Sequence, residues 1–359
     1  MTHVYLIGAG PGDPELLTLK GRRHLETADI IIYDRLVNPI LLHLAKKGAE
    51  FLYCGKLPRH HTMRQEQINA AIVANAVQGK KVVRLKGGDP AIFGRVGEEM
   101  KAISDAGLTY QVIPGITSSS AASIYAGIPL THRDHNGHVT FATGHQKNNA
   151  LTEIDMNNLL QGGTLAFYMS IENLSHICEK LIRQPALAKL PIAIIEWGTL
   201  GRQKVLTGSV DTIEAALAKT MLANPAMIII GHVVTERTGS SWFEQQPLFG
   251  KRYLLASERG FTFEQICEYT ELGAHVYAFP SLNTKDTRFD DITTRVLTEQ
   301  NWDGILLHDG TPVRILQEEL ARLGINKTFH IFQNNDAHVI LGECSQGGMT
   351  FDERTRYSK

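Results

Sequence analysis

The sequence shows no excess of charge of either sign. Its 36 Lys and Arg residues stand against 37 Asp and Glu residues, which gives a formal net charge of -1. A neutral chain has no global positive field to gather nucleic acid or anionic lipid, so any anion-binding site must be local. The longest apolar runs, such as Ala226–Ile230, are far shorter than a membrane span. The composition therefore argues against whole-surface nucleic-acid binding and against membrane insertion.

Cysteine is scarce, and a secretion signal is missing. The four cysteines, Cys54, Cys178, Cys267 and Cys344, are too dispersed for a CxxC metal pair or a disulfide framework. The first residues lack the basic flank, long apolar core and cleavage site of a signal peptide. We therefore expect a cytoplasmic protein with free, mostly buried thiols.

The 359 residues, of which 43% are hydrophobic and 20% charged, are typical of a globular chain of two or three domains. Short apolar runs alternate with amphipathic stretches, a pattern typical of strands that feed crossover helices in a parallel-rich sheet. The predicted fold class is α/β. In the first part we expect strands at 3–9, 29–34, 50–54, 81–86 and 110–113, and helices near 15–26, 39–47, 64–78 and 95–106.

Two further series of strands follow. Thr311 and Pro312 would open a helix after the last expected strand. The expected organisation is an N-terminal lobe at 1–115, a second lobe at 116–240, a linker at 241–250, a small α/β domain at 251–347 and a polar tail at 348–359. The strands expected in these parts are 138–143, 164–169, 191–196, 204–208 and 226–233, and then 252–257, 274–279 and 303–307.

Two glycine loops follow expected strands. The first, Gly8–Asp13 (GAGPGD), departs from the dinucleotide fingerprint, because Asp13 stands where glycine is required and Pro11 lacks an amide for a pyrophosphate. Asp34 does lie about where a ribose-binding acid belongs, so an NAD-type oxidoreductase remains an alternative. The second loop is Lys86–Pro90 (KGGDP). Ligands of open α/β sheets lie outside the carboxyl ends of the strands, so we expect both loops to line one crevice.

At these residues the sequence resembles the tetrapyrrole methylases and, within them, the uroporphyrinogen-III C-methyltransferases. The resemblance covers about residues 1–240. It is carried by Val4–Asp13, Tyr33–Val37, Cys54–Lys56, His60–Met63, Gln67–Asn69, Arg84–Arg95, Val112–Thr117, Pro129–Arg133, Thr143–His145, Tyr168–Met169 and Glu196–Thr199.

The resemblance implies two αβα lobes of the class III methyltransferase type, with S-adenosylmethionine (SAM) bound between them in a homodimer, and no metal. It implies methylation of uroporphyrinogen III at C2 and C7 to give precorrin-2 through precorrin-1, for siroheme or cobalamin. Asp34 would accept a proton and Lys56 would donate one. The implied SAM-binding residues are Pro11, Gly87, Gly88, Asp89, Ile92, Thr117, Ser118, Met169 and Gly198.

A substrate with eight carboxylates requires a basic pocket. Residues 51–65 contain no acid, and residues 80–95 contain Asp89 alone against five basic side chains. Arg35 and Arg64 are the preferred substrate contacts because a guanidinium can bind both carboxylate oxygens. His61 is the third candidate. Solvated loop and helix charges remain the alternative explanation for each of these side chains.

Other interpretations stay open beside this one. His132, His135 and His138 follow one another at intervals of three, which could indicate a metal or chelatase site. The segment reads as an exposed loop without supporting cysteines, and a metal site is therefore disfavoured. A methylase of a later cobalamin precursor is the alternative within the family. A non-catalytic scaffold is disfavoured because Asp34 and Lys56 are both present.

The last part of the chain resembles the first half of the uroporphyrinogen-III synthases. That family closes its active site between two such domains, and only about 110 residues remain here. His308–Gly310 (HDG) also stands where a Thr-Ser type segment is expected. We therefore favour a remnant that stabilises or docks over retained synthase activity. The matching segments are Lys251–Ser257, Leu272–Val276 and Trp302–Leu307.

Overall fold

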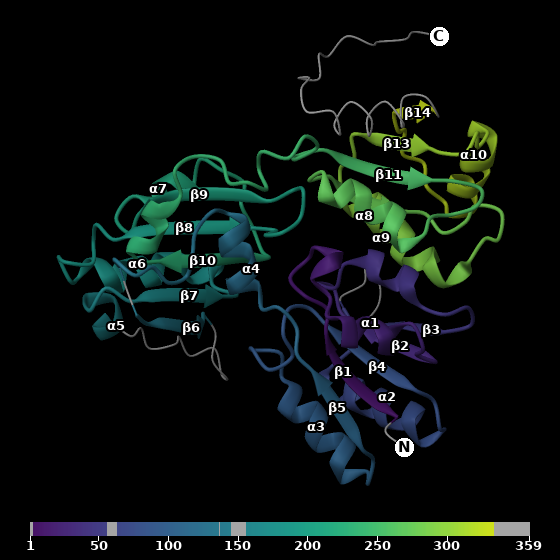
Figure 1. The fold of residues 1–359 in the computed structure, drawn as a ribbon, viewed down its shortest axis with the longest axis horizontal. Helices are drawn as coiled ribbons and strands as arrows, with labels where there is room; N and C mark the ends of the chain where they lie inside the picture. Colours follow the sequence, from purple (N-terminus) through teal and green to yellow (C-terminus); the bar gives the residue numbers. More distant parts are fainter. Residues whose placement is uncertain (1–2, 56–62, 136, 145–155, 334–359) are drawn as a thin grey trace. The chain divides into compact units, whose positions relative to one another are not determined.

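The computed structural model describes residues 3–55, 63–135, 137–144 and 156–333. The chain divides into two compact units, residues 1–245 and 246–359. The first unit contains two sheets, and the second unit contains one (Figure 1). Each sheet of the first unit, together with its helices, is called a lobe, and the first lobe comes first along the chain. In the described part, no helix has the length and apolar character needed to cross a membrane.

The first lobe is built on a five-stranded parallel sheet in the order β3-β2-β4-β1-β5. All five strands lie where the sequence predicts them. This order places β1 and β4 side by side, so the two glycine loops that follow them leave the same edge of the sheet. The strands are β1 (Val4–Gly8), β2 (Ile30–Tyr33), β3 (Glu50–Tyr53), β4 (Val82–Lys86) and β5 (Tyr110–Ile113).

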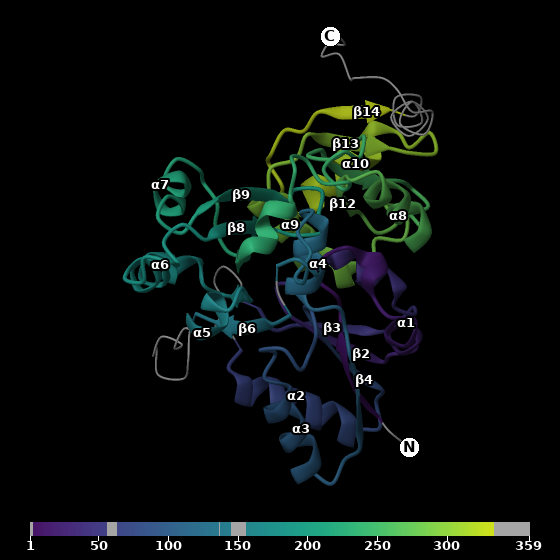
Figure 2. The ribbon, with the colours of Figure 1, turned by 60° about the vertical axis from the view of Figure 1, so that its left-hand side comes forward.

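Two helices cover one face of this sheet. α2 (Gln65–Val77) and α3 (Val96–Asp105) lie together there (Figure 2). Alternate residues of the central strands, such as Leu6 and Ile32, pack with Ile72 of α2 in one buried cluster. The remaining helical segments of this lobe are η1 (Pro14–Leu16), α1 (Leu19–Leu25) and η2 (Pro39–Leu44).

The second lobe contains a five-stranded sheet in the order β6-β7-β10-β8-β9. Only β6 and β7 pair in parallel, and the other neighbours are antiparallel. The expectation of a parallel-rich sheet is therefore wrong for this lobe, because apolar periodicity reports burial and not strand direction. The strands are β6 (Val139–Thr143), β7 (Thr164–Tyr168), β8 (Pro191–Glu196), β9 (Lys204–Ser209) and β10 (Ala226–Ile230).

Both faces of the second sheet are covered. Phe167, Ile194 and Ile228 point to the face packed by α6 (Leu174–Ile182) and α7 (Ile213–Leu217). The alternate residues on these strands are in the cluster on the opposite face, which is covered by α4 and η5 (Figure 1). The remaining elements of this lobe are α4 (Ser118–Tyr125), α5 (Met156–Leu160), η4 (Ile171–Asn173) and η5 (His232–Glu236).

The segment where the linker is expected begins with residues that pack on the second lobe. The rings of Trp242 and Phe243 each lie 4.8 Å from the ring of Tyr125 at the end of α4. Ser241 Oγ donates to the Tyr125 carbonyl, and Arg237 pairs with Glu244 at 2.8 Å. These contacts hold the segment up to Glu244 against the first unit, whose last residue is Gln245.

The second unit is a four-stranded parallel sheet in the order β12-β11-β13-β14. The sequence predicts the first three strands and the helix after Pro312 but misses β14, a strand of three residues. At the carboxyl edge, Ser257 Oγ donates to Asp309 Oδ2 at 2.9 Å. The elements are β11 (Arg252–Ala256), α8 (Phe263–Glu271), β12 (His275–Ala278), η6 (Thr287–Phe289), α9 (Asp290–Glu299), β13 (Gly304–Leu307), α10 (Val313–Arg322) and β14 (Ile331–Gln333).

Cys54, Cys178 and Cys267 are free and buried, as the sequence predicts, whereas Cys344 lies outside the described residues. Burial raises the pKa of the Cys54 thiol to about 11 and that of Cys178 to about 12. A thiol with a pKa of about 11 has only about one molecule in a thousand ionised at pH 8, and the thiolate is the reactive form.

We therefore expect Cys54 and Cys178 to resist alkylation in the folded protein at pH 8, as measured by peptide mapping after iodoacetamide treatment. Both should react after unfolding in urea, which is the internal control. Because the folded pKa values lie above those of the unfolded chain, these thiols should also cost stability as the pH rises from about 9 towards 11. Rapid labelling of either residue in the native protein would contradict the burial described here.

Candidate functional site

The loops after β1 and β4 are joined through their backbones. Gly10 N donates to Gly88 O at 3.2 Å, and Gly88 N donates to Gly10 O at 2.7 Å. Ala9 N also donates to Lys86 O at 2.7 Å. The two glycine loops that the sequence singles out therefore form one continuous backbone surface at the edge of the first sheet.

A third loop, after β5, reaches the same point. A Cβ atom added to Gly8 would lie 2.6 Å from Gly115 Cα, and one added to Gly115 would lie 2.3 Å from Gly88 O. Non-bonded atoms do not approach so closely, and the obstructing atoms are backbone, so glycine is required at both positions. Asp89 Oδ2 accepts from Gly115 N at 2.9 Å and holds the third loop in place.

Tyr168, at the end of β7 in the second lobe, connects that lobe to these loops. Its hydroxyl lies 2.6 Å from Thr117 Oγ1 and 2.6 Å from Ser119 Oγ at the start of α4. Its ring lies 4.9 Å from the ring of Phe93, which follows the second glycine loop. The Tyr168 side chain is buried and packs in the core of the second lobe.

Asp13 makes a second connection between the lobes. Its backbone N–H donates to Thr199 Oγ1 at 3.0 Å, and its carboxylate Oδ2 accepts from Tyr125 OH at 2.7 Å. Burial raises the pKa of Asp13, while the hydrogen bonds from Tyr125 and from Glu15 N oppose that rise. In the sequence, Asp13 stands out only as a departure from the dinucleotide fingerprint. Its two hydrogen-bond partners could not be predicted because they lie 112 and 186 residues away along the chain.

Several residues around these loops hold the left-handed backbone conformation that usually favours glycine. The φ angles are 53° at Phe93, 53° at Met169, 49° at Trp197 and 70° at Thr199. They come from the loops after β4, β7 and β8. Such strain is retained only where the surroundings enforce it, and it is typical of binding sites.

The residues implied to bind SAM are distributed around this junction. Gly88 lies beside Thr117 and Ser118, since a Cβ on Gly88 would lie 4.0 Å from Thr117 Cα and 3.8 Å from Ser118 N. Gly198 packs so tightly on α4 that a Cβ would lie 2.3 Å from Ala122 Cβ. Asp89 adjoins Gly88 and binds the third loop, as described above.

The other four candidates differ in their exposure. Met169 is 51% exposed at the end of β7. Pro11 is half-buried directly after the Gly10–Gly88 bridge, and Ile92 packs at the margin of the second lobe's core. Gly87 lies against Leu36, where a Cβ would come within 3.0 Å of the Leu36 Cβ.

Asp34, the expected proton acceptor, lies directly after β2 and is about one-third exposed, at 32%. One oxygen, Oδ1, accepts from Leu36 N at 3.2 Å and fixes the turn. The other, Oδ2, lies 3.4 Å from Arg84 Nη2. The carboxylate is therefore oriented by its own turn and by one buried cation, and it still has solvent-accessible surface.

A buried ionic cluster lies behind Asp34. Glu99 Oε1 of α3 accepts from Lys86 Nζ at 2.9 Å and from Arg84 Nε at 3.1 Å. Arg84 Nη1 also donates to the carbonyls of Ile32 and Leu85. Burial lowers the pKa of Lys86, as does the charge of Arg84, and Glu99 opposes both. Burial lowers the pKa of Arg84, but the charges of Asp34 and Glu99 raise it, and the net result is a raised pKa.

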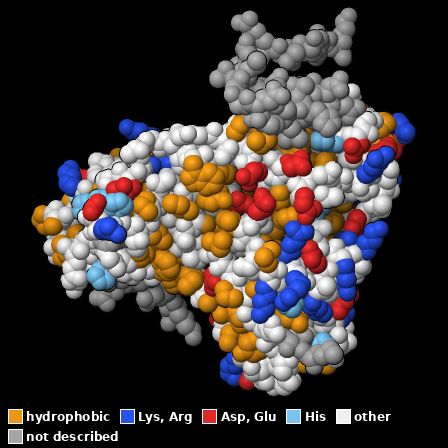
Figure 3. Space-filling view, in the orientation of Figure 1, with side chains coloured by type: hydrophobic (Ala, Val, Ile, Leu, Met, Phe, Trp, Pro, Cys, Tyr) orange, Lys and Arg blue, Asp and Glu red, His pale blue; other side chains and the backbone are white. Residues whose placement is uncertain are grey.

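Four of the five basic side chains in the acid-poor stretch at 80–95 are paired with acids. Lys80 pairs with Glu50 at 2.8 Å, Arg95 with Glu98 at 2.7 Å, and Arg84 and Lys86 share Glu99. The acids come from other elements, which a count along one segment cannot reveal. On the face drawn in Figure 3, basic and acidic side chains are likewise mixed.

The other substrate candidates fall into two groups. Arg35 and Arg64 are exposed, and in the described part of the chain neither guanidinium is held in an ion pair. Arg35 adjoins Asp34, and Arg64 is the cap residue that precedes α2. Lys56, the expected proton donor, and His61, the third substrate candidate, lie outside the described residues.

Comparison with known proteins identifies the family. Residues 3–214 match the family described as Tetrapyrrole (Corrin/Porphyrin) Methylases. The chain belongs to the tetrapyrrole methylases. It is 48% identical over 235 residues to a uroporphyrinogen-III C-methyltransferase of Priestia megaterium, covering 65% of this chain and 99% of that relative.

Two further tetrapyrrole methylases are informative. A Bacillus subtilis protein named uroporphyrinogen-III C-methyltransferase is 44% identical over 286 residues, which is 79% of this chain and 59% of the relative. That alignment is longer than the first unit and therefore includes part of the second. The solved uroporphyrin-III C-methyltransferase of Thermus thermophilus in complex with S-adenosylhomocysteine has a TM-score of 0.56 and 35% identity, covering 65% of this chain and 99% of that one.

The meeting of the three loops predicts how glycine substitutions behave in this methylase. Gly8→Ala should destabilise the first lobe, because its Cβ would overlap two backbone segments that cannot move independently. Gly97→Ala in α3 is the matched control, since nothing lies within 4 Å of its added Cβ. Thermal unfolding of both variants would measure the difference. Equal behaviour of the two variants would contradict the described contact.

Proposed function

We propose that this chain transfers methyl groups from SAM to C2 and C7 of uroporphyrinogen III, forming precorrin-2 through precorrin-1. The carrying observation is the junction of three glycine-containing loops with Asp34 at the neighbouring strand end. The names of the similar proteins support this class of reaction, and the bound S-adenosylhomocysteine of the Thermus thermophilus structure supports the methyl donor.

The residues present fit SAM better than a dinucleotide. Backbone groups of Gly88 and the start of α4 lie next to one another without side chains between them, which provides a surface for close ligand approach. Pro11 has no amide to offer a pyrophosphate, and the proposed ligand contains none. When bound, SAM supplies a methyl group on a sulfonium, which is already a good electrophile. The protein therefore contributes mainly position and alignment.

Asp34 is proposed to accept the proton that leaves the pyrrole carbon after methylation. A carboxylate acts as a general base when it is within reach of the proton and its ionised form is maintained. Its Oδ2 lies 3.4 Å from Arg84 Nη2, and its partial exposure leaves it accessible to a substrate. Arg84 is a positioning residue in this scheme, because Glu99 and two carbonyl groups hold its guanidinium in place.

Arg35 and Arg64 are proposed to bind substrate carboxylates. Both are exposed and neither is committed to an ion pair among the described residues, in contrast to the paired cations of residues 80–95. Bidentate contact with carboxylates is the specific advantage of arginine here. Lys56 as proton donor and His61 as a further substrate contact remain part of the proposal on the strength of the family resemblance.

The remaining assignments are also proposals. We propose a cytoplasmic homodimer whose product enters siroheme or cobalamin synthesis. We propose lobes at 1–115 and 116–240, with SAM bound between them, and a linker, small domain and tail after them. The second unit is proposed to stabilise or dock rather than to act as a synthase, and its partial match to the Bacillus subtilis methyltransferase supports a role alongside methylation.

Asp34→Asn should reduce turnover by at least about a hundredfold while leaving SAM affinity nearly unchanged, because the amide keeps the turn but cannot accept the proton. The assay incubates SAM and uroporphyrinogen III and follows methyl transfer by mass spectrometry, with SAM binding measured separately by calorimetry. Asp105→Asn, an exposed acid paired with Lys101 on α3, is the control. A normal rate in Asp34→Asn would remove this residue from the mechanism. Binding of NADH in place of SAM would favour the oxidoreductase alternative.

Lys56→Met should slow turnover by more than about tenfold without changing the melting temperature, because the methyl thioether keeps the length of the side chain but cannot donate a proton. The same methyl-transfer assay and a thermal melt measure the two quantities. Lys47→Met, on the exposed turn before β3, is the control. A variant that aggregates, with a rate per folded molecule equal to the wild type, would point to a structural role for Lys56.

A further inference from the structure

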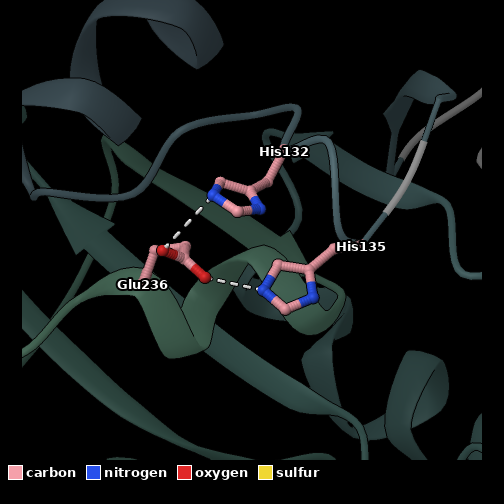
Figure 4. A group of neighbouring side chains, drawn as sticks. All are labelled: His132, His135 and Glu236. Carbon is pink, nitrogen blue, oxygen red and sulfur yellow. Dashed lines mark hydrogen bonds and ion pairs between the residues drawn. The ribbon is translucent and has the colours of Figure 1, made fainter.

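A second group of polar side chains lies in the second lobe, away from the glycine loops. It consists of His132 and His135, from the loop before β6, and Glu236, the last residue of η5. One ligand atom from each lies within 4.8 Å of the others. Figure 4 shows both imidazole rings turned toward the Glu236 carboxylate, each facing one of its two oxygens.

The backbone explains why the two histidines meet. His135 N donates to His132 O at 3.1 Å, which closes a turn and places both side chains on the same side of the loop. The rings lie 5.0 Å apart between centroids. Glu236 then approaches from an element 101 residues further along the chain, with Oε1 at 2.6 Å from His135 Nε2 and Oε2 at 3.8 Å from His132 Nε2.

We propose that His132, His135 and Glu236 bind a transition-metal cation of the Zn²⁺ class. Two imidazole nitrogens and one carboxylate oxygen are a donor set that suits Zn²⁺ and its first-row neighbours better than Mg²⁺ or Ca²⁺, which prefer all-oxygen sites. The three side chains are 25–35% exposed, so an ion from solvent can reach them. Three protein ligands leave a fourth position for water.

The distances require only small movements. Two ligand atoms bound tetrahedrally at about 2.1 Å from one metal ion are about 3.4 Å apart. The His135–Glu236 pair would therefore open from 2.6 Å, and the widest separation among the three ligand atoms, at most 4.8 Å, would close by up to about 1.4 Å. Changes of this size lie within the reach of side-chain rotation on a partly exposed surface.

The surroundings favour a cation as well. Asp134 Oδ2 lies 3.9 Å from His132 Nδ1, so a further negative charge is near the proposed site. Asp134 N also donates to His132 Nδ1 at 3.3 Å, which orients the ring. Arg237, next to Glu236, does not compete for this carboxylate in the structure, because its guanidinium pairs with Glu244 and donates to the Ala126 carbonyl.

The sequence pattern indicated His132, His135 and His138 as one possible metal site. In the structure, His138 is exposed next to β6 and lies outside the group, and Glu236 is the third member instead. The spacing of three residues alone could not supply Glu236, because the third ligand comes from a distant element.

The test uses the untagged full-length chain after removal of metal with a chelator. Co²⁺ is the probe, because its visible absorption reports coordination by nitrogen and oxygen ligands, and Zn²⁺ is then added in competition. We expect one Co²⁺ per chain, displaced by Zn²⁺ and not by Mg²⁺. His135→Ala and Glu236→Gln should each raise the dissociation constant by at least about tenfold. His138→Ala, the matched control, should not change it.

Circular dichroism and the melting temperature of each variant establish that the fold is retained. Glu236→Gln is the decisive variant, since its amide keeps the shape of the side chain and can still hydrogen-bond His135. Absence of the Co²⁺ band in the wild-type chain would overturn the proposal. So would a band that His135→Ala and Glu236→Gln leave unchanged, because the three residues would then form a hydrogen-bonded loop contact only.

Discussion

The backbones of three loops meet at the carboxyl edge of the first sheet, and most of the proposed site depends on that contact. Gly8, Gly88 and Gly115 approach so closely that a Cβ on Gly8 or Gly115 would overlap neighbouring backbone. The sheet order makes this possible, because β4 and β5 both flank β1. With no side chains between them, the loops expose backbone groups to a ligand. Asp89 then adds a side-chain bond that keeps the third loop in register.

The two lobes are joined near this junction by hydrogen bonds from Asp13, whose N–H donates to Thr199 and whose carboxylate accepts from Tyr125. Within the second lobe, Tyr168 binds Thr117 and Ser119. A buried polar group without a partner is costly, so each bond specifies one arrangement of the loops. The left-handed residues after β7 and β8 lie beside these bonds, which is where the packing can enforce them.

The first lobe contains a buried ionic cluster behind Asp34. Glu99 binds Arg84 and Lys86 at once, and Arg84 also reaches Asp34 at the strand end. Two buried cations and one buried anion leave a positive charge that Asp34 balances at the margin of the cluster. This arrangement connects the proposed proton acceptor to the core.

The sequence by itself determined the local features. Apolar periodicity located all five strands of each lobe, and the glycine loops marked the edge of the first sheet where three loops meet. Partners were decided only by the tertiary structure. Glu99 pairs with Arg84 and Lys86 of a stretch that contains few acids of its own, and Glu236 joins two histidines from 101 residues away. The physical reason is the separation along the chain between the residues that interact. Helices, strands and turns depend on neighbouring residues, whereas ion pairs and ligand sets depend on which elements the fold places side by side.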